Sequence, residues 1–487
     1  MKICFDNEKY EKLQSEQILE RVKKFSGKLY LEFGGKLFDD LHASRVLPGF
    51  RPDAKVRILQ KLSDKTEIIM VVGAPDVERK KIRADYGISY DEEVIRQIAK
   101  LRELGLYVST VLITMYNGQK NADKLITRLK NLGERVYVHT YTKGYPDDVA
   151  TIVSPEGYGA NPYIETTRPI VVVTAPGPGS GKMSTCLSQM YHESTKGIIS
   201  GYAKFETFPI WNLPVDHPVN LAYMAATADL KDKNLIDTYH LRAYKKRVTN
   251  YNRDLQNFAV LQTILSKIAG DKIYNSPTDM GVNMAGFAIT DDKGCMDASY
   301  NEIIRRYYKA LCDEKLGVEP STTATNILEI IKKHDIDIKR RRVIFAANNK
   351  FMQTGFASVA IELSNTSIVT GRETDLLSAA SSAVLNCLKE ITDIDDDVYL
   401  LGDEVCKTIC ELKSLISGGA QKLDIYDTLC ALAICSATNK LAKKAFDAIG
   451  ELKLTDAHSS HILSASEQST LKKLGINISC EPEYLQR

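Results

Sequence analysis

Apolar and polar positions follow two different rhythms along the first two thirds of the chain. Short runs rich in β-branched residues are followed by stretches in which apolar residues recur every three or four positions. The first pattern is typical of buried parallel strands and the second of amphipathic helices. The expected strands cover 28–33, 67–73, 106–114, 135–139, 171–174, 201–209 and 281–289, with helices at 93–104 and 121–132 between them. This alternation predicts an α/β fold with a doubly wound, mostly parallel sheet.

One helical pattern in this region is unusually long. Apolar residues spaced by three or four predict a single helix over 237–269. A stripe of that length is more often core or a seam between subunits than part of a cofactor site. We therefore expect a homo-oligomer.

The basic run 339–342 marks an expected domain boundary near 335. The sequence thus predicts an N-terminal α/β region over 1–335 and a smaller, helix-rich C-terminal α/β domain over 336–487. The second domain opens with the short apolar run 343–346, which we interpret as a strand. Its expected helices cover 376–388, 403–416, 425–437 and 438–448.

Residues 171–185 form the segment with the strongest chemical signal. An apolar run is followed by a turn with three glycines and two prolines, and then by an apolar stripe at helical spacing. The pattern predicts a strand, a glycine-rich turn and a helix that starts near Lys182. Backbone N–H groups and the positive end of a helix dipole meet at such a turn, and an anion, most often a phosphate, binds there.

The segment matches the P-loop pattern G-x-x-x-x-G-K-[ST] only in part. Gly181 and Lys182 fit, but Pro176 replaces the first glycine and Met183 replaces the hydroxyl residue that holds Mg²⁺. The turn resembles the variant loop Thr-Pro-x-Gly-x-Gly-Lys-Ser-Thr of formate–tetrahydrofolate ligases and related ATP-using enzymes more than a standard Walker loop. A glycine-rich turn that binds nothing is the alternative. Lys182 favours the phosphate, because the helix dipole disfavours a cation at this end.

The roles expected at this site follow from phosphate chemistry. Lys182 would neutralise the β- and γ-phosphates of ATP or another phosphorylated nucleotide, and the turn's backbone amides would cradle them. The expected cofactor-binding residues are Gly177, Gly179, Ser180, Gly181, Lys182, Ser184 and Thr185. Asp291 and Asp292 follow the expected strand 281–289, where nucleotide folds place bases and Mg²⁺ ligands. We expect Asp291 to act with Lys182 in catalysis, and Thr185 with Asp292 to bind the metal, although a capping aspartate is the simpler interpretation of either acid.

Two further features of the N-terminal region leave alternatives open. Gly177-x-Gly179 with Glu206 imitates a dinucleotide fingerprint, but Lys182 occupies the position of the third glycine. Gly34-Gly35-Lys36 follows the strand 28–33 and forms either a second anion site with Arg45 or, as we favour, an ordinary turn. Glu32 lies inside that apolar strand, and because an unpaired buried carboxylate is costly we expect Lys36 or a ligand as its partner.

Other charged or metal-ligating clusters favour structural roles. The basic run 79–83 is interpreted as a solvated face, with a phosphate clamp as the alternative. Asp456, His458 and His461 invite a metal site, but no fourth ligand lies near them in the sequence, and a hydrogen-bonded polar edge is the favoured interpretation. Cys406 and Cys410 lack a second cluster to complete a metal site.

The composition limits the classes of binding partner that we expect. The 487 residues are 44% hydrophobic and 26% charged, with 64 basic and 62 acidic residues. A net charge of +2 predicts no nucleic-acid or anionic membrane partner, and no apolar run is long enough for a spanning helix. Ten scattered cysteines in a chain of this length favour reduced thiols and a cytoplasmic location.

Five segments together resemble an uncharacterised bacterial family (uncharacterised protein family 0371, domain of unknown function 1846). They are Tyr-Leu-Glu-Phe-Gly-Gly-Lys at 30–36, Leu-Pro-Gly-Phe-Arg-Pro-Asp at 47–53, Thr-Ala-Pro-Gly-Pro-Gly-Ser-Gly-Lys at 174–182, Lys-Phe-Glu-Thr-Phe-Pro-Ile-Trp-Asn-Leu-Pro at 204–214 and Leu-Gly-Ile-Asn-Ile-Ser-Cys-Glu-Pro at 474–482. The resemblance spans nearly the whole chain and implies an N-terminal α/β part and a smaller C-terminal domain. It implies no activity.

The expected function therefore depends on the turn. The leading hypothesis is a cytoplasmic protein that binds a nucleoside triphosphate or another phosphorylated small molecule, with Mg²⁺, for phosphoryl transfer or ligation. This would make it an ATP-dependent transferase or ligase. The alternatives are a non-catalytic oligomer that binds a phosphorylated metabolite, and a nicotinamide-dependent enzyme.

Overall fold

The chain forms two compact units, each with its own sheet. The computed structural model describes residues 3–25, 27–35, 37–38, 40–83, 87–270, 273–418 and 422–484. The N-terminal unit combines Lys2–Tyr223 with Asp232–Met296, and the C-terminal unit combines Met224–Lys231 with Asp297–Arg487. Along the sequence the main division falls between Met296 and Asp297, ahead of the boundary expected near 335.

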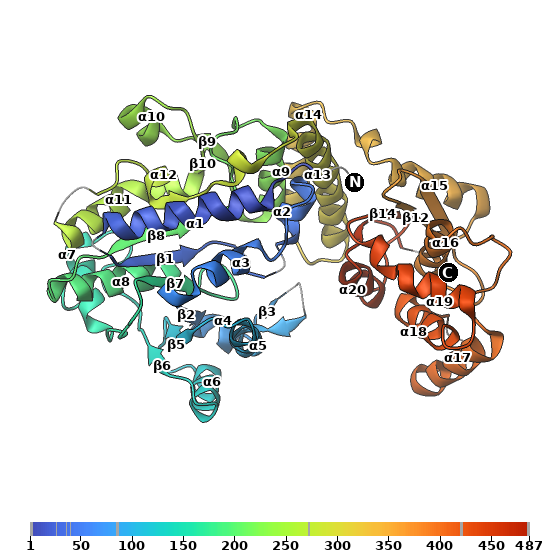
Figure 1. The fold of residues 1–487 in the computed structure, drawn as a ribbon, viewed down its shortest axis with the longest axis horizontal. Coiled ribbons are helices and arrows are strands. Elements are labelled where there is room, and N and C mark those ends of the chain that lie inside the picture. Colours follow the sequence, from blue (N-terminus) through green and yellow to red (C-terminus); the bar gives the residue numbers. More distant parts are fainter. Residues whose placement is uncertain are drawn as a thin grey trace. The chain divides into compact units, whose positions relative to one another are not determined.

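A seven-stranded parallel sheet forms the centre of the N-terminal unit, which confirms the predicted fold class. Its strands are β1 (Leu29–Phe33), β2 (Thr66–Gly73), β5 (Val108–Thr114), β6 (Val136–Val138), β7 (Ile170–Thr174), β8 (Gly201–Phe205) and β11 (Gly281–Val282). The order is β11-β8-β1-β7-β2-β5-β6, and Figure 1 shows the strands from β8 to β6 side by side in that order. β1, β2 and β7 are buried along their whole length, as expected for strands covered on both faces.

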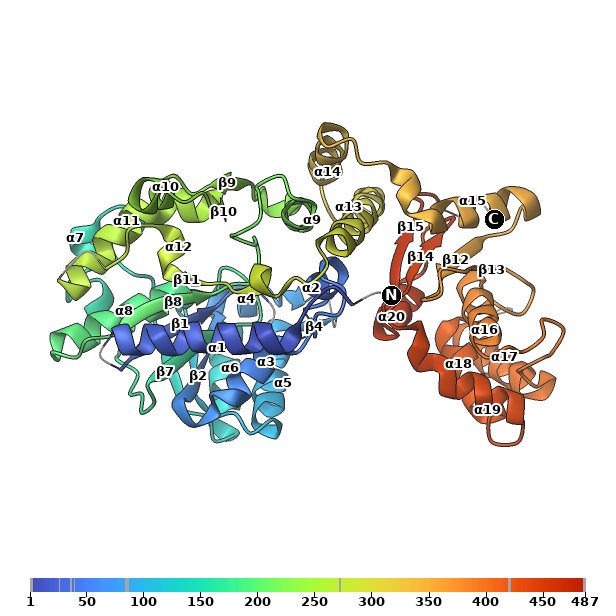
Figure 2. The ribbon, with the colours of Figure 1, turned by 45° about the horizontal axis from the view of Figure 1, so that its top comes forward.

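Helices cover both faces of this sheet. They are α1 (Asn7–Lys24), α2 (Leu41–Val46), α3 (Ala54–Lys61), α4 (Ala74–Glu78), α5 (Tyr90–Glu103), α6 (Lys120–Asn131), α7 (Val149–Ile152), α8 (Lys182–Thr195), α9 (Pro218–Ala226), α10 (Thr238–Tyr244), α11 (Asn252–Ala269) and α12 (Pro277–Met280). Two short strand pairs, β3 (Ile82–Arg83) with β4 (Ile88–Ser89) and β9 (Asn234–Ile236) with β10 (Thr249–Tyr251), lie outside the main sheet. Helix α1 runs along strands β1 and β8, as Figure 2 also shows, and packs against α3.

The direction of the chain reverses at the neighbouring strands β1 and β7. After β1 the chain passes to β2 on one side, whereas after β7 it passes to β8 on the other side. Because parallel crossovers are right-handed, these two connections place their helices on opposite faces, with α8 packed on β1, β7 and β8. The loops after β1 and β7 therefore diverge at a topological switch point, where ligands bind in open α/β sheets.

A four-stranded mixed sheet forms the core of the C-terminal unit. Its order is β13-β12-β14-β15, and only the β14–β15 pair is parallel. The strands are β12 (Ser358–Glu362), β13 (Ile368–Arg372), β14 (Asp456–Ser459) and β15 (Asn477–Cys480). The helices are α13 (Asp292–Lys315), α14 (Ser321–Lys333), α15 (Arg342–Thr354), α16 (Ala379–Ile391), α17 (Asp403–Ser417), α18 (Ile425–Cys435), α19 (Lys440–Asp447) and α20 (Ala465–Lys473).

The alanine- and serine-rich helix α16 packs unusually close to strand β13. A Cβ atom added to Gly371 would lie 2.1 Å from the backbone nitrogen of Ala383. Glycine on the strand and small residues on the helix are therefore both required for this contact.

Three elements differ from the sequence-based expectation. The run 343–346 lies in helix α15, because a short apolar run does not distinguish a strand from a buried helix face. The expected strand 281–289 ends at Val282 and is followed by a 3-10 turn, Ala285–Ala288. The expected helix 237–269 is divided into α10, β10 and α11, and Lys245 in a left-handed conformation ends α10.

Buried Arg341 joins α15 to the C-terminal sheet. Its side chain is 2% exposed. The guanidinium donates to Asp456 Oδ1 at 2.9 Å, to Ser479 Oγ at 3.0 Å and to the carbonyl oxygens of Ala457 and Asn477 at 2.8 and 2.6 Å. The donor groups of one cation thus satisfy acceptors on both parallel strands, β14 and β15.

Replacing Arg341 with alanine should destabilise the protein strongly. The change leaves the acceptors of β14 and β15 without their donor, and breaking a buried ion pair in this way costs about 3–5 kcal/mol. Arg342→Ala is the matched control, because Arg342 is exposed and its pair with Glu362 at 3.2 Å contributes at most about 1 kcal/mol. Urea unfolding followed by circular dichroism measures both, and equal losses in the two variants would contradict this role of Arg341.

Candidate functional site

The loop 175–181 lies between the interior strand β7 and helix α8. β7 pairs in parallel with β1 on one side and β2 on the other, and α8 begins at Lys182. The predicted strand, turn and helix are therefore confirmed. Gly179 and Gly181 have φ values of +73° and +80°, a conformation that side chains other than glycine rarely adopt.

Contacts with neighbouring elements fix the shape of the loop. A Cβ atom on Gly177 would lie 2.1 Å from the hydroxyl oxygen of Tyr90, so only glycine fits against this ring. Thr114 at the end of β5 donates to the carbonyl oxygen of Ser180 at 2.7 Å. Ser180 Oγ donates to the carbonyl oxygen of Gly177 at 2.8 Å. The loop is thus held from both sides without using its N–H groups.

The loop and the first turn of α8 carry a row of backbone N–H donors. Among the residues that the structure describes, none accepts a hydrogen bond from the backbone N–H groups of 179–184. Over the part of the chain that the structure describes, the one hydrogen bond of Lys182 Nζ is to the carbonyl oxygen of Gly177, at 3.4 Å. N–H groups, a helix N-terminus and an ammonium group therefore converge at the switch point, which is the arrangement that binds anions.

The two hydroxyl residues expected to replace the P-loop serine have protein partners. Thr185 is buried, and its Oγ1 donates to the carbonyl oxygen of Gly181 at 2.9 Å. Ser184 Oγ lies 3.4 Å from Thr142 Oγ1. In this conformation Ser184 is closer to the loop surface than Thr185, whose hydroxyl is used inside the first helical turn.

Asp291 and Asp292 lie at the start of α13, after the 3-10 turn and not at a strand end. Asp291 Oδ1 accepts from the backbone N–H of Gly294 at 3.2 Å, as a capping residue does. Asp292 pairs with His217 Nε2 at 3.1 Å. Within the described ranges, no group of three or more histidine, cysteine or acidic side chains is arranged to hold a metal ion.

A second feature of the site is a buried charged cluster beside Lys182. Glu32 on β1 is aligned with Lys204 on β8, so both side chains lie on the face that α8 covers. Tyr202 donates to Glu32 Oε2 at 2.6 Å, and Lys204 Nζ lies 2.7 Å from Glu206 Oε1 and 2.9 Å from Asp254 Oδ2. We call Glu32, Lys182, Lys204, Glu206 and Asp254 the charged cluster.

The groups of the charged cluster shift one another's pKa values. Burial raises the pKa of the Glu206 carboxyl to about 7, although Lys204 opposes the shift, and Asp254 and Glu32 add to it. Burial lowers the pKa of Lys182, which Glu32 opposes and Lys204 reinforces. Burial also disfavours the charged form of Lys204, but Asp254, Glu206 and Glu32 together hold its pKa above the ordinary range.

The sequence signalled only part of this cluster. Glu32 was conspicuous inside an apolar strand, and its hydroxyl partner is Tyr202. The suggested partner Lys36 lies outside the described residues. Gly34 and Gly35 instead contact Lys55, whose Nζ lies 3.1 Å from the carbonyl oxygen of Gly34. Asp254 was not found, because only the packing of α11 brings it to β8.

The contacts of the basic run 79–83 support a structural role for it. In the basic run 79–83, Arg79 and Lys81 pair with Asp76, and Lys81 Nζ lies 5.0 Å from the centre of the Tyr90 ring beside Gly177. The side chain of Arg83 lies outside the described part of the chain. Lys81 thus links this run to the ring that packs against the loop.

The suspected metal site in the C-terminal unit is a hydrogen-bonded polar edge. Asp456 pairs with Arg341. His458 is buried, with Nδ1 2.9 Å from Ser479 Oγ and Nε2 3.3 Å from Glu481 Oε1. Asp456 and His458 are thus held by hydrogen bonds and ion pairs within the C-terminal unit. This agrees with the structural interpretation favoured from the sequence.

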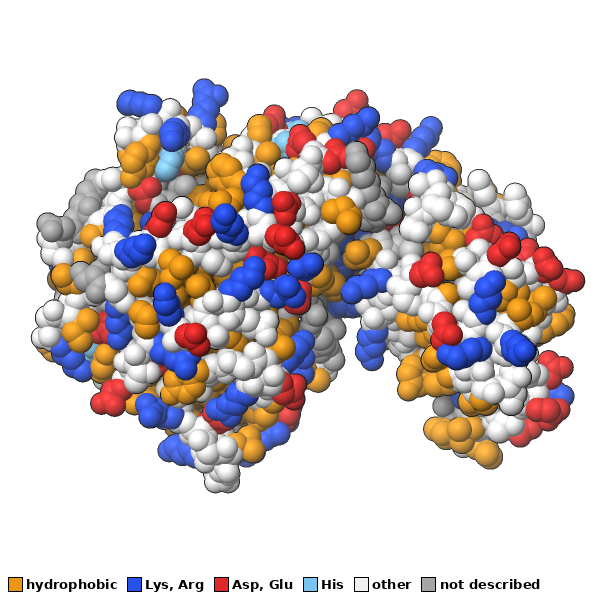
Figure 3. Space-filling model, in the orientation of Figure 1, with side chains coloured by type: hydrophobic (Ala, Val, Ile, Leu, Met, Phe, Trp, Pro, Cys, Tyr) orange, Lys and Arg blue, Asp and Glu red, His pale blue; other side chains and the backbone are white. Residues whose placement is uncertain are grey.

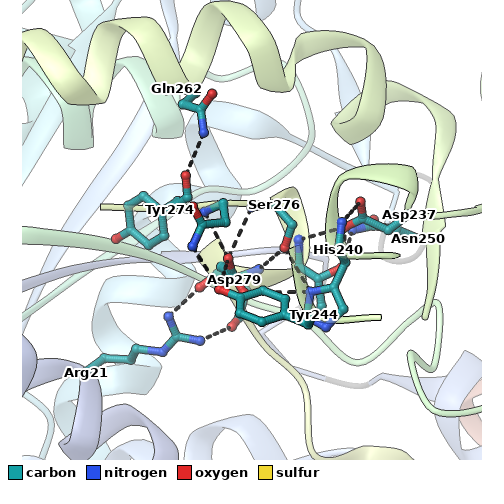
Figure 4. Close-up of polar contacts among 12 residues, drawn as sticks. Arg21, Asp237, His240, Tyr244, Asn250, Gln262, Tyr274, Ser276 and Asp279 are labelled. Atoms are coloured by element: carbon teal, nitrogen blue, oxygen red, sulfur yellow. Dashed lines mark hydrogen bonds and ion pairs between the residues drawn. The ribbon is translucent and has the colours of Figure 1, made fainter. Parts of the chain in front are cut away.

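A hydrogen-bond network around α12 holds strand β11 in place (Figure 4). His240 Nδ1 lies 2.9 Å from Ser276 Oγ, and Asp279 lies close to both. This trio resembles a nucleophilic triad in composition only, since Ser276 is fully buried and forms a capping box with Asp279. Tyr274 donates from the same segment to the carbonyl oxygen of Tyr202 and so supports β8 behind the charged cluster.

No described helix is long and apolar enough to cross a membrane.

The comparison with known families covers nearly the whole chain. Residues 3–335 match the family model described as domain of unknown function DUF1846, N-terminal, and residues 339–487 match its C-terminal counterpart. A UPF0371 protein of Clostridium botulinum (strain Alaska E43 / Type E3) is 49% identical over 494 residues, 99% of this chain and 98% of the relative. A UPF0371 protein of Streptococcus thermophilus (strain ATCC BAA-250 / LMG 18311) is 49% identical over 484 residues, with the same two shares.

Glu206 should make the stability of the protein fall between about pH 4.5 and pH 7. A carboxyl group whose pKa is raised from 4.5 to about 7 binds its proton more tightly in the folded chain than in the unfolded chain. Stability on the order of 3 kcal/mol is therefore lost as the pH rises from about 4.5 to about 7, where the unfolded chain has released this proton and the folded chain still holds it. The difference in unfolding free energy between the wild type and Glu206→Gln, measured by urea unfolding from pH 5 to 8, isolates this contribution. A difference that does not change with pH would contradict the shift.

Proposed function

The chain belongs to the uncharacterised UPF0371 family, which carries the DUF1846 domain, and we propose its function from the site alone. We propose that it is a cytoplasmic protein that binds a nucleoside triphosphate or another phosphorylated small molecule at the loop 175–181. Phosphoryl transfer or ligation is the chemistry that this site suits best. The observation that supports the proposal is the row of free N–H groups of 179–184 beside Lys182 at the switch point.

The electrostatics of the site favour an anion over a neutral ligand. A cation at the first position of a helix is unfavourable by about 0.3–1 kcal/mol unless an anion compensates it. A bound phosphate would accept hydrogen bonds from the loop and from the ammonium group of Lys182, which in the structure lies 3.4 Å from the carbonyl oxygen of Gly177. Gly177, Gly179, Ser180 and Gly181 would supply the backbone that surrounds it.

The proposal includes Mg²⁺, but the expected metal ligands would have to give up hydrogen bonds or ion pairs to bind it. Thr185 would have to give up its hydrogen bond to Gly181, and Asp292 its pair with His217, to become metal ligands. Ser184 requires the smallest change. Asp291 as a catalytic base would likewise have to leave the backbone N–H of Gly294.

A non-catalytic protein that binds a phosphorylated metabolite is the second candidate. The observation that favours it is that, over the described ranges, no cluster of three or more histidine, cysteine or acidic residues is placed to hold a metal. A nicotinamide cofactor has less support, because Glu206, the suggested ribose-binding acid, pairs with Lys204.

A homo-oligomer is also proposed, but for a different reason than the sequence indicated. The apolar stripe of α11 is buried within the chain, at Phe258, Leu261, Ile264, Leu265 and Ile268. Leu412, Leu415 and Ile416 on α17 are 55%, 84% and 76% exposed. Figure 3 shows apolar side chains at the surface over this helix. Exposed apolar patches of this kind mark interaction sites.

Replacing Lys182 with alanine should weaken anion binding about ten- to a hundredfold. The change removes a charge-assisted hydrogen bond, worth roughly 1.5–3 kcal/mol. Thermal shift with ATP, GTP, NAD and sugar phosphates first selects the ligand, and calorimetry then compares the variants. Lys120→Ala is the matched control, because Lys120 is an exposed lysine at the first position of α6 after strand β5. Equal ligand affinity in Lys182→Ala and the wild type would contradict the proposal.

Magnesium should strengthen nucleotide binding only modestly in the wild type. Met183 occupies the position where a P-loop supplies a hydroxyl ligand. Met183→Ser should therefore increase the ratio of nucleotide affinities with and without Mg²⁺, measured by calorimetry. A strong magnesium dependence in the wild type that Thr185→Ala abolishes would instead assign the ligand to Thr185.

A further inference from the structure

The charged cluster holds more carboxylates than ammonium groups. Within the described ranges, the amines of the cluster are Lys182 and Lys204, beside the buried or half-buried carboxylates Glu32, Glu206 and Asp254. Fully ionised, the cluster carries one unit of negative charge. An unbalanced charge away from water is unfavourable, so one additional positive charge stabilises the cluster.

Glu206 is the carboxylate of the cluster that takes up this positive charge, in the form of a proton. The partners of the neighbouring groups show why. Lys204 is shared between Glu206 and Asp254, and it also contacts the hydroxyl group of Tyr251. Glu32 has the hydroxyl proton of Tyr202 as its partner. Burial keeps Tyr223 on α9 neutral by raising its pKa, and Asp232 and Glu206 add to the shift. Arg253 pairs with Asp232 at 2.7 Å.

Strand β11 and Trp211 close the site around Glu206 against solvent. Glu206 is 6% exposed, and its backbone N–H donates to the carbonyl oxygen of Val282 at 3.1 Å. A Cβ atom added to Gly281 would lie 3.1 Å from Glu206 Oε2 and 2.5 Å from the Trp211 ring. In this closed environment a change of charge nearby is only weakly screened.

We propose that anion binding at the loop 175–181 is coupled to the uptake of one proton by the charged cluster, and that Glu206 carries this proton. The inference rests on the proposed phosphate site. Glu32 on β1 is aligned with Val173 on β7, two residues before the loop begins, and Lys182 starts the helix that covers this face. A bound anion therefore adds negative charge beside the cluster and draws on the charge of Lys182. One proton passes from solvent to a carboxylate oxygen of Glu206 as the anion binds, and it returns to solvent when the anion leaves.

Calorimetry with sulfate tests the coupling directly. Sulfate is a suitable probe because, unlike phosphate, it does not titrate near neutral pH. Titrations at about pH 7.5 in two buffers that differ in ionisation enthalpy yield the number of protons taken up, and we expect roughly 0.3–0.7 proton per sulfate bound. In Glu206→Gln sulfate should still bind, but the heats in the two buffers should agree.

Two further variants keep the test decisive. Asp254→Asn removes a carboxylate that favours protonation of Glu206, so the pH of greatest proton uptake should move down. Glu67→Gln is the control, because Glu67 is a buried glutamate that accepts from the backbone N–H groups of Thr167 and Arg168 near the start of β2, at the other end of the strands. It should leave proton uptake unchanged.

The outcomes separate this inference from the proposed function. Sulfate binding that depends on Lys182 but shows no proton uptake, or the same uptake in Glu206→Gln, overturns the coupling and leaves the phosphate site standing. Sulfate binding that is absent, or equal in the wild type and Lys182→Ala, overturns both. Uptake that is lost in Glu206→Gln and shifted in Asp254→Asn supports the coupling.

Discussion

Burial of charge at the ends of strands β1 and β8 is the constraint on which the N-terminal site depends. Glu32 and Lys204 lie opposite each other in the sheet, beneath α8, where water does not balance them. Each element around them contributes a partner: Tyr202 from the same sheet, Asp254 from α11 and Lys182 from α8. A shift of register by one residue would move the side chains of β1 to the opposite face and separate these charges.

The glycine-rich loop meets a second requirement, which is that its carbonyl groups be satisfied while its N–H groups stay free. No described residue accepts from the backbone N–H groups of 179–184. Ser180 and Thr114 donate to carbonyl oxygens of the loop, and Gly179 and Gly181 adopt left-handed conformations. Gly177 has no such conformation, but the ring of Tyr90 leaves no space for a side chain there. The three glycines are therefore needed for two reasons, backbone conformation and close packing.

The parts of this site that the sequence predicted are those set by local pattern. A β-branched run, a glycine turn and a helical stripe identified β7, the loop and α8, because each signal lies within a few residues. Asp254 could not be found in this way, since it meets Lys204 only through the packing of α11. Residues 281–289 and 343–346 were assigned as strands because short apolar runs do not distinguish strands from helices or turns. Asp237 caps the N-terminus of α10 and Lys245 caps its C-terminus. The apolar spacing continues through these positions, so it does not reveal where the helix ends.

Lys182 connects the two requirements, because both the loop and the charged cluster need its charge. Without an anion, its ammonium group reaches a loop carbonyl oxygen and balances part of the charge of Glu32. With an anion at the loop, the same charge serves the anion, and the cluster must compensate by other means. Tyr202 already donates a hydrogen bond to Glu32, and Asp254 and Glu206 share Lys204. Protonation of one carboxylate is therefore the compensation that requires no change in the backbone. The proposed dependence between the occupancy of the loop and the protonation of Glu206 therefore passes through two lysines: Lys182 serves the loop and Glu32, and Lys204 serves Glu206 and Asp254.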